Sequence, residues 1–127
     1  MKLDTDSLAP IYIQIADWLE NEILNEHFKP DEKVFSQYKL AELFNINPAT
    51  AAKGLNLLSD EGILYTKRGL GKFAAANARE IILNKRRDTT LKEMVVDLAA
   101  EARRLGVSEE ELLEMVGTAY EKRKGEL

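Results

Sequence analysis

The chain has 127 residues, of which 45% are hydrophobic and 31% are charged, and its formal net charge is −4. This balance indicates one small folded domain, with or without an appendage, and excludes wholesale disorder; no apolar run reaches the roughly 18 residues of a membrane span. The lack of cysteine and the single histidine, His27, exclude disulfides, thiolate catalysis and cysteine-ligated zinc, so we predict no metal site and no cofactor.

The first predicted helix covers residues 9–26. Its apolar residues recur at intervals of three and four, which places them on one helical face. They are Ile11, Ile15, Trp18, Leu19 and Ile23. After a turn and a short strand at residues 33–35, Ser36 is the expected N-cap of a second, short helix that ends at Phe44.

The third predicted helix begins at Asn47 and Pro48 and ends at Gly62. Asparagine at the N-cap and proline at the first helical position are strong start signals, and glycine permits the left-handed residue that ends many helices. The spacing predicts that one face packs on the core, through Ala51, Leu55 and Leu58. The outer surface then carries Ala49, Thr50, Lys53 and Asn56, flanked by Ala52 and Leu57.

A β-hairpin is predicted next, with strands at residues 63–66 and 73–75. Its tip, residues 67–72, is basic and contains two glycines, which permit positive φ and a close approach of the backbone to a partner. Helix, short strand, helix, tight turn, helix and hairpin is the pattern of a winged helix-turn-helix, and we assign it to residues 1–75.

The remainder, residues 76–127, is predicted as a helical domain. A linking segment at residues 77–85 precedes two helices, each opened by a capping box: Thr90 with Glu93, and Ser108 with Glu111. Gly106 ends the first of them. The predicted fold class is therefore mainly α with a small β-hairpin, a winged helix-turn-helix followed by an α-helical hairpin.

Each helix of this hairpin carries an apolar stripe. A two-helix hairpin cannot cover such a stripe by itself, so we assign the stripe to dimerisation; docking on the winged domain is the alternative. The stripe residues are Leu91, Val95, Leu98, Ala102, Leu105, Leu112, Val116, Ala119 and Tyr120. A twofold homodimer would place two recognition helices on symmetric half-sites, which predicts an inverted-repeat DNA site.

Positive charge is concentrated in the winged domain despite the negative total. Residues 33–72 contain six basic and three acidic side chains, whereas residues 1–32 contain two basic and eight acidic ones. The basic residues fall on the second helix, the third helix and the hairpin or beside them, and are Lys33, Lys39, Lys53, Lys67, Arg68 and Lys72. This distribution favours double-stranded DNA as the partner.

The chemistry of the outward residues fits the two grooves of DNA. Thr50 can contact a thymine methyl or a phosphate, and Lys53 can reach a guanine or a phosphate in the major groove. Arg68 beside Gly69 could enter the minor groove, while Lys67 and Lys72 bind phosphates.

The sequence resembles the N-terminal domain of the GntR family of bacterial transcriptional regulators. The resemblance is carried by residues 10–15, 40–44, 47–50, 55 and 58, 60–64 and 68–73. The short two-helix tail is similar to that of the YtrA subfamily, whose members lack large effector domains. The resemblance implies a winged helix-turn-helix that binds DNA as a homodimer, and we expect a repressor.

The resemblance also implies particular DNA-facing positions. Ser36 and Tyr38 would approach the backbone, and Arg68-Gly69 would form the wing tip. The recognition turn would contain Asn47, Pro48, Ala49, Thr50 and Ala52. Many family members have arginine where Tyr38, Pro48 and Ala52 stand and proline where Phe35 stands, so the family's usual base-reading chemistry is missing here.

Three further expectations complete this interpretation. Residues 68–72 superficially resemble a phosphate loop, but the GxxxxGK[ST] spacing is absent, so we predict no catalytic residue and no enzyme. The alternative function is a winged-helix module that binds protein without DNA. The polar, acidic start lacks the features of a secretory signal, so we expect a cytoplasmic protein with no membrane partner; a small-molecule effector is possible but unidentified.

Overall fold

The computed structural model describes residues 3–4 and 6–126, with side chains to residue 122, and the chain divides into two compact units. The first unit is Met1–Lys85 and the second is Arg86–Leu127. The predicted fold class is confirmed, because the chain is mainly helical with a single two-stranded sheet in the described residues.

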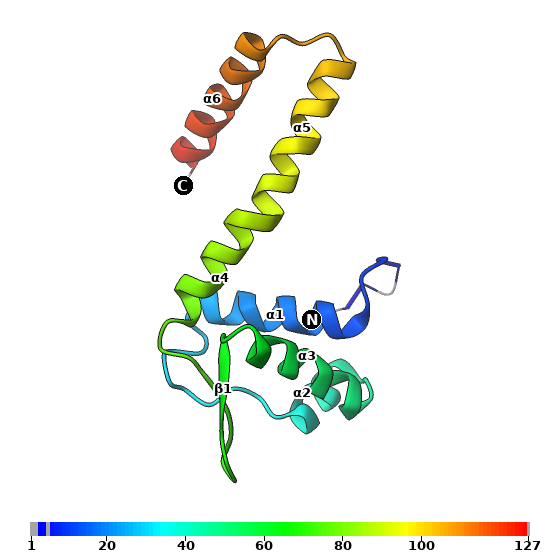
Figure 1. The fold of residues 1–127 in the computed structure, drawn as a ribbon, viewed down its shortest axis with the longest axis vertical. Coiled ribbons are helices and arrows are strands. Elements are labelled where there is room, and N and C mark those ends of the chain that lie inside the picture. The colour runs from blue at the N-terminus through cyan, green and yellow to red at the C-terminus, as the bar shows by residue number, and fades with distance from the viewer. Residues whose placement is uncertain (1–2, 5, 127) are drawn as a thin grey trace. The chain divides into compact units, whose positions relative to one another are not determined.

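Three helices and a hairpin make up the first unit as far as residue 74. They are α1 (Ile11–Leu24), α2 (Gln37–Phe44), α3 (Pro48–Asp60), β1 (Leu64–Lys67) and β2 (Gly71–Ala74). Helix α3 packs against both α1 and α2, and the hairpin extends beyond the helices (Figure 1). The core residues predicted on the third helix, Ala51, Leu55 and Leu58, are all buried, as are Ile15, Leu19 and Ile23 of the first.

The first unit extends past residue 75, where the sequence placed the domain boundary. The predicted link is the helix α4 (Ala78–Arg86), whose Ala78 and Ile82 are only 2% and 0% exposed and belong to the core of the first unit. These two residues lie four apart and therefore face the same side of the helix. This helix completes the core of the winged unit.

A partly buried ion cluster ties α4 to the rest of the first unit. Glu20 of α1 is 1% exposed, and the Lys85 ammonium donates to its carboxylate. The same ammonium donates to Glu61, directly after α3, with 3.0 Å between Nζ and Oε2. Burial by itself lowers the pKa of Lys85, but the hydrogen bonds to the two carboxylates outweigh this effect, and the pKa is raised.

The second unit consists of a π-helical turn, η1 (Arg87–Leu91), and the helices α5 (Lys92–Arg104) and α6 (Glu109–Glu126). The predicted start at Ser108 is confirmed, because its Oγ accepts a hydrogen bond from the Glu111 amide at 3.1 Å. Gly106 has φ +75°, as expected for a residue that ends a helix.

The predicted capping box at Thr90 and Glu93 is wrong. Thr90 lies inside η1, and the backbone stays helical through α4, η1 and α5, with φ −65° and ψ −43° at Leu91. The Ser/Thr-x-x-Glu pattern starts a helix only where the chain is not already helical. Residues 78–92 contain neither glycine nor proline, so nothing in the sequence interrupts the preceding helix there.

We predict that Lys85→Met lowers the free energy of unfolding by about 2–4 kcal/mol, because it removes the ammonium from two carboxylates, one of them buried. Because the folded-state pKa of Lys85 is raised, its contribution is complete below the ordinary lysine pKa of about 10.4 and is lost as pH rises through the higher, folded value. Urea denaturation between about pH 6 and 11 measures both effects.

Lys39→Met, which removes an exposed lysine of α2, is the control and should leave the unfolding free energy within about 0.5 kcal/mol of the parent. Equal stability of the Lys85 variant and the parent at neutral pH would contradict a stabilising role of the ion cluster.

Candidate nucleic-acid interface

Helices α2 and α3 form a helix-turn-helix whose ends are fixed by side-chain caps. Ser36 Oγ accepts from the Lys39 amide at 3.1 Å, and Asn47 Oδ1 accepts from the Ala49 amide at 2.8 Å. Between the helices Asn45 adopts the left-handed conformation, with φ +54°. Both predicted N-caps are confirmed, and Pro48 occupies the first turn of α3, where its missing N–H is harmless.

The residues predicted to face DNA on α2 and α3 lie at the surface. Tyr38 is 70% exposed, and Thr50 and Ala52 are half-buried. The other members of the set, Ser36, Asn47, Pro48, Ala49 and Lys53, are exposed. An open groove runs beside them, lined by Tyr12, Gln37, Ala49, Ala52, Lys53, Asn56, Leu57 and Asp60. The outer face of α3 therefore shares one surface with the start of α2 and with α1.

Helix α3 is held close to α1 by Gly54. A Cβ atom at this glycine would lie 2.9 Å from the Tyr12 carbonyl oxygen and 3.1 Å from Ile15 Cγ2. Lys53, the preceding residue, places its ammonium over the Tyr12 ring, with 4.1 Å between Nζ and the ring centroid. Neither contact is local in the chain, so the sequence alone gives no signal that Tyr12 and Gly54 belong to the site.

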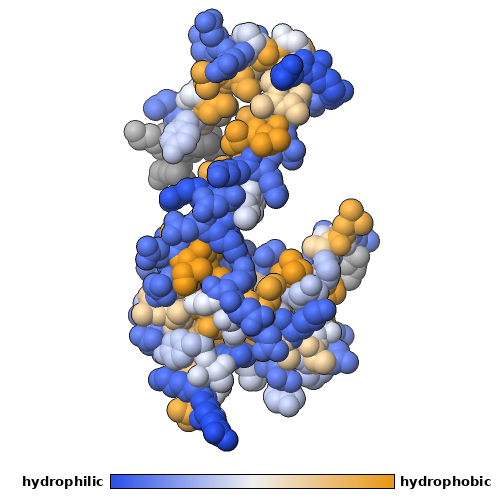
Figure 2. Space-filling model, in the orientation of Figure 1, coloured by the Kyte–Doolittle hydropathy of each residue, from blue (hydrophilic) through white to orange (hydrophobic). Residues whose placement is uncertain are grey.

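The hairpin forms the predicted wing. Compared with the predicted strands, β1 ends one residue closer to the tip and β2 begins two residues closer to it. The pairing aligns Tyr65 with Phe73, Thr66 with Lys72, and Lys67 with Gly71. At the tip Gly69 and Gly71 have φ +79° and +115°, so the predicted need for glycine is met there. Hydrophilic side chains gather at the end of the hairpin (Figure 2).

The cations of the wing are held in different ways. Lys67 Nζ lies 4.5 Å from the centroid of the Phe73 ring, which stacks on Tyr65. Lys72 Nζ faces α3 and donates to Ser59 Oγ at 2.9 Å and to Thr66 Oγ1 at 3.0 Å. Arg68 is exposed at the tip.

Two contacts outside the hairpin complete the wing. Lys33 forms an isolated bridge with Phe73, and its Cε would lie 3.0 Å from a Cβ at Gly71, so this lysine adds a positive charge beside the tip. Lys33 belongs to the basic region predicted from the sequence but not to the predicted set of DNA-facing residues. Tyr65 Oη donates to Asp31 Oδ1 at 2.8 Å, and this hydrogen bond, with desolvation and the carboxylate charge, raises the pKa of Tyr65.

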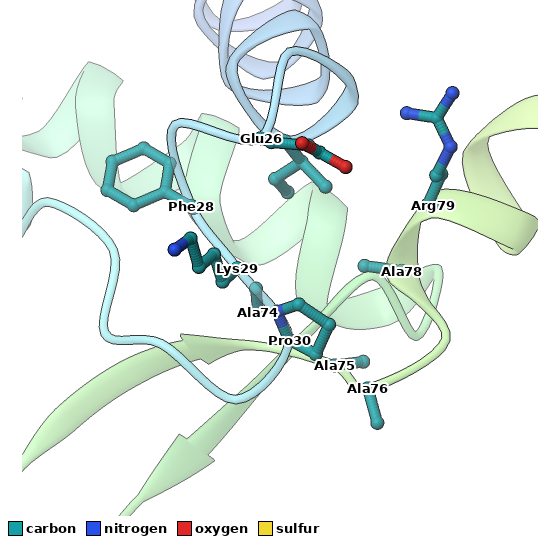
Figure 3. Close-up of a pocket in the computed structure, with 10 residues that line it drawn as sticks. Glu26, Phe28, Lys29, Pro30, Ala74, Ala75, Ala76, Ala78 and Arg79 are labelled. Atoms are coloured by element: carbon teal, nitrogen blue, oxygen red, sulfur yellow. The ribbon is translucent and has the colours of Figure 1, made fainter.

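A separate pocket of about 270 Å³ lies where the loop after α1 meets the exit of β2 and the start of α4. Its walls are mostly apolar, with Phe28, Pro30 and four alanines, and the charged residues Glu26, Lys29 and Arg79 also line it (Figure 3). Arg79 Nη1 donates to the Leu24 carbonyl at 2.6 Å. The pocket is slightly smaller than usual small-molecule sites, which start at about 300 Å³.

In the part of the chain that the structure describes, no group of three or more His, Asp or Glu side chains is placed to hold a metal ion. None of the helices among the same residues is both long and apolar enough to cross a membrane.

A helix-turn-helix followed by a basic two-stranded wing defines a winged helix-turn-helix protein. Comparison with known proteins agrees: residues 11–73 match the family described as "Bacterial regulatory proteins, gntR family". The chain belongs to the GntR family.

Relatives and solved structures extend this result. The chain is 33% identical over 116 residues to the HTH-type transcriptional repressor YtrA of Bacillus subtilis, covering 91% of this chain and 88% of that protein. A putative GntR-family regulator from Bacteroides thetaiotaomicron has TM-score 0.77 and 28% identity over 90% of this chain and 99% of its own.

A third match is the DNA-binding domain of AraR in complex with operator ORE1. Its TM-score is 0.52, with 27% identity over 57% of this chain and 89% of that domain. The family and these relatives place the chain among YtrA-like, DNA-binding transcriptional regulators.

We predict that Gly54→Ala lowers the melting temperature, because the new methyl group meets backbone and a branched side chain of α1 and must force the helices apart at a cost of about 1–3 kcal/mol. Asn56→Ala is the control, since it increases helix propensity at an exposed position of the same helix and should melt at or slightly above the parent temperature. Thermal unfolding followed by circular dichroism measures both. A Gly54→Ala variant as stable as the control would show that the contact between the helices is not tight.

Proposed function

We propose that the protein is a sequence-specific transcriptional repressor that binds an inverted-repeat operator as a homodimer. The observation that carries the proposal is the combination, in one unit, of a capped helix with an outward polar face and a wing that presents Lys33, Lys67 and Arg68. The operator-bound AraR domain supports this use of the fold.

In the proposed complex α3 enters the major groove. Ala49, Thr50 and Ala52 are small side chains near its N-terminus, so they allow the backbone to approach base edges and thymine methyl groups closely. The unpaired N–H groups of the first turn favour a neighbouring phosphate. Arg68 at the wing tip enters the minor groove, and Lys67 and Lys33 bind the adjoining phosphates.

The exposed apolar surface of the second unit supports the homodimer. Within residues 86–122, for which burial is described, Ala102 alone is buried, at 7% exposed. Of the predicted stripe, Leu112 is half-buried, Ala119 is exposed, and the exposed large side chains are Leu91, Val95, Leu98, Leu105, Val116 and Tyr120. Met94, Val96, Leu113 and Met115 are also more than half exposed. Apolar side chains gather over α5 and α6 (Figure 2).

Apolar surface of this extent marks an interaction site. A second copy of the chain is the proposed partner, since the same stripe on each copy can form a self-complementary, twofold interface. The twofold axis then places two copies of α3 on symmetric half-sites, which gives the inverted repeat.

The alternative, a winged helix that binds protein without DNA, does not require a basic wing. Failure of the protein to retard any duplex at low salt would favour it. The apolar pocket of about 270 Å³ near Arg79 is a place in the winged unit where a small effector would find an enclosed surface.

We predict that Arg68→Gln weakens DNA binding roughly ten-fold at about 0.15 M salt and reduces the slope of log K against log salt by about one, because one phosphate or minor-groove contact is lost. The measurement is a fluorescence-anisotropy titration, at several salt concentrations, of a duplex selected by the protein from a random-sequence library.

Arg79→Gln is the matched control, because it removes the same charge and keeps an amide donor for the Leu24 carbonyl. It should bind DNA with the parent affinity and slope. Equal behaviour of the two glutamine variants would remove Arg68 from the interface.

We predict that Leu98→Glu converts the dimer to monomers at micromolar concentration, because it places a charge in the apolar stripe. Ala100→Glu adds the same charge two residues further along α5, on the opposite side of the helix, and should stay dimeric. Sedimentation velocity distinguishes the two. A monomeric parent protein, or a dimeric Leu98→Glu variant, would contradict the proposed interface.

A further inference from the structure

Tyr12 of α1 borders the outer face of α3. Its half-buried ring receives the ammonium of the exposed Lys53, and the distance of 4.1 Å from Nζ to the ring centroid is well within the range of about 6 Å for a cation–π contact. The two residues are 41 positions apart in the chain, so the contact depends on how α1 packs against α3.

The place of the ring is set by backbone packing. The Tyr12 carbonyl oxygen faces Gly54, where even a single added carbon would come within 2.9 Å. Lys53 is the neighbour of this glycine, so the ring and the lysine are brought together by a close backbone contact between the two helices. A change of the Tyr12 side chain leaves that backbone contact in place.

The direction in which Lys53 is held decides what it can reach. A helix with its side chains is about 10–12 Å wide and the major groove is about 12 Å wide, so side chains at the front of a docked helix meet bases and lateral ones meet the groove walls. The Lys53 ammonium lies over a residue of another helix and is therefore lateral to α3. The walls of the groove are phosphates.

We propose that Tyr12 is a positioning residue that holds Lys53 at the side of the recognition helix, where it binds a backbone phosphate and does not read a base. This inference rests on the proposed DNA-binding function. The ring contributes by fixing a long, otherwise freely rotating side chain before DNA arrives, which reduces the conformational entropy lost on binding.

The test is a double-mutant cycle. Tyr12→Leu, Tyr12→Phe, Lys53→Ala and the double variant Tyr12→Leu/Lys53→Ala are titrated with the library-selected duplex and with a shuffled duplex at several salt concentrations. Tyr12→Phe keeps the ring and should bind like the parent. Tyr12→Leu should weaken binding about 2- to 5-fold on both duplexes, the value of an exposed cation–π contact, with an unchanged salt slope because Lys53 keeps its charge.

Lys53→Ala should lower the slope of log K against log salt by about one. In the Lys53→Ala background, Tyr12→Leu should not change the DNA affinity further. A second readout does not involve DNA: ring currents should shift the Lys53 Cε protons upfield in the parent and in Tyr12→Phe, but not in Tyr12→Leu. Thermal melts confirm that the variants fold, and Tyr12→Met serves as a second ring-free variant.

Several outcomes would overturn the proposal. If Tyr12→Leu lowers the DNA affinity equally in the parent and in the Lys53→Ala background, Tyr12 acts independently of Lys53. If Tyr12→Leu binds DNA more tightly than the parent, the ring holds Lys53 away from DNA. A loss confined to the selected duplex would mean that Lys53 reads a base. These failures leave parent binding intact, whereas a parent protein that retards no duplex at low salt contradicts the proposed function itself.

Discussion

The close contact between α1 and α3 at Gly54 is the constraint on which the winged unit depends. It allows the inner residues of α3 to pack without gaps on α1, and Ala51, Leu55 and Leu58 are accordingly buried. With one face of α3 committed to the core, the opposite face is left at the surface with its polar and small side chains. The shape of the candidate interface therefore follows from the packing of the core.

Three lysines of this interface have partners within the protein before any DNA binds. Lys53 and Lys67 each lie over an aromatic ring, and Lys72 is hydrogen-bonded to hydroxyl groups. Flexible lysines lose much side-chain entropy when they are immobilised in a complex, and a side chain already restricted in the free protein loses less. Arg68 lies at the exposed tip, next to Gly69. Its side chain can therefore change conformation to fit a DNA groove.

Much of the winged unit could be predicted because its signals are local. Asn47-Pro48 determines where α3 begins, Ser36 where α2 begins, and the glycines where the hairpin turns. The packing of α4 on the core was missed because Ala78 and Ile82 are too few to show a clear apolar face within a polar segment.

The failures beyond that have similar physical reasons. The false capping box at Thr90 followed from a short pattern that ignores whether the preceding residues are already helical. The ring under Lys53 and the bridge from Lys33 to the wing join residues far apart in the chain, so only the tertiary structure could show them. The dimerisation and DNA-facing residues remain predictions. The structure places most of them at the surface, but it buries Ala102.

The hydrogen bonds of Lys72 bear on how the protein would select its DNA target. Its ammonium is bonded both to Ser59, near the end of α3, and to Thr66 in the first strand of the wing. Thr66 and Lys72 are paired within the hairpin, so of these two bonds the one to Ser59 joins the hairpin to α3 and restrains the wing relative to the helix. In the proposed complex, a restrained spacing between wing and helix favours duplexes whose groove width and stiffness match it, even where no side chain touches their bases.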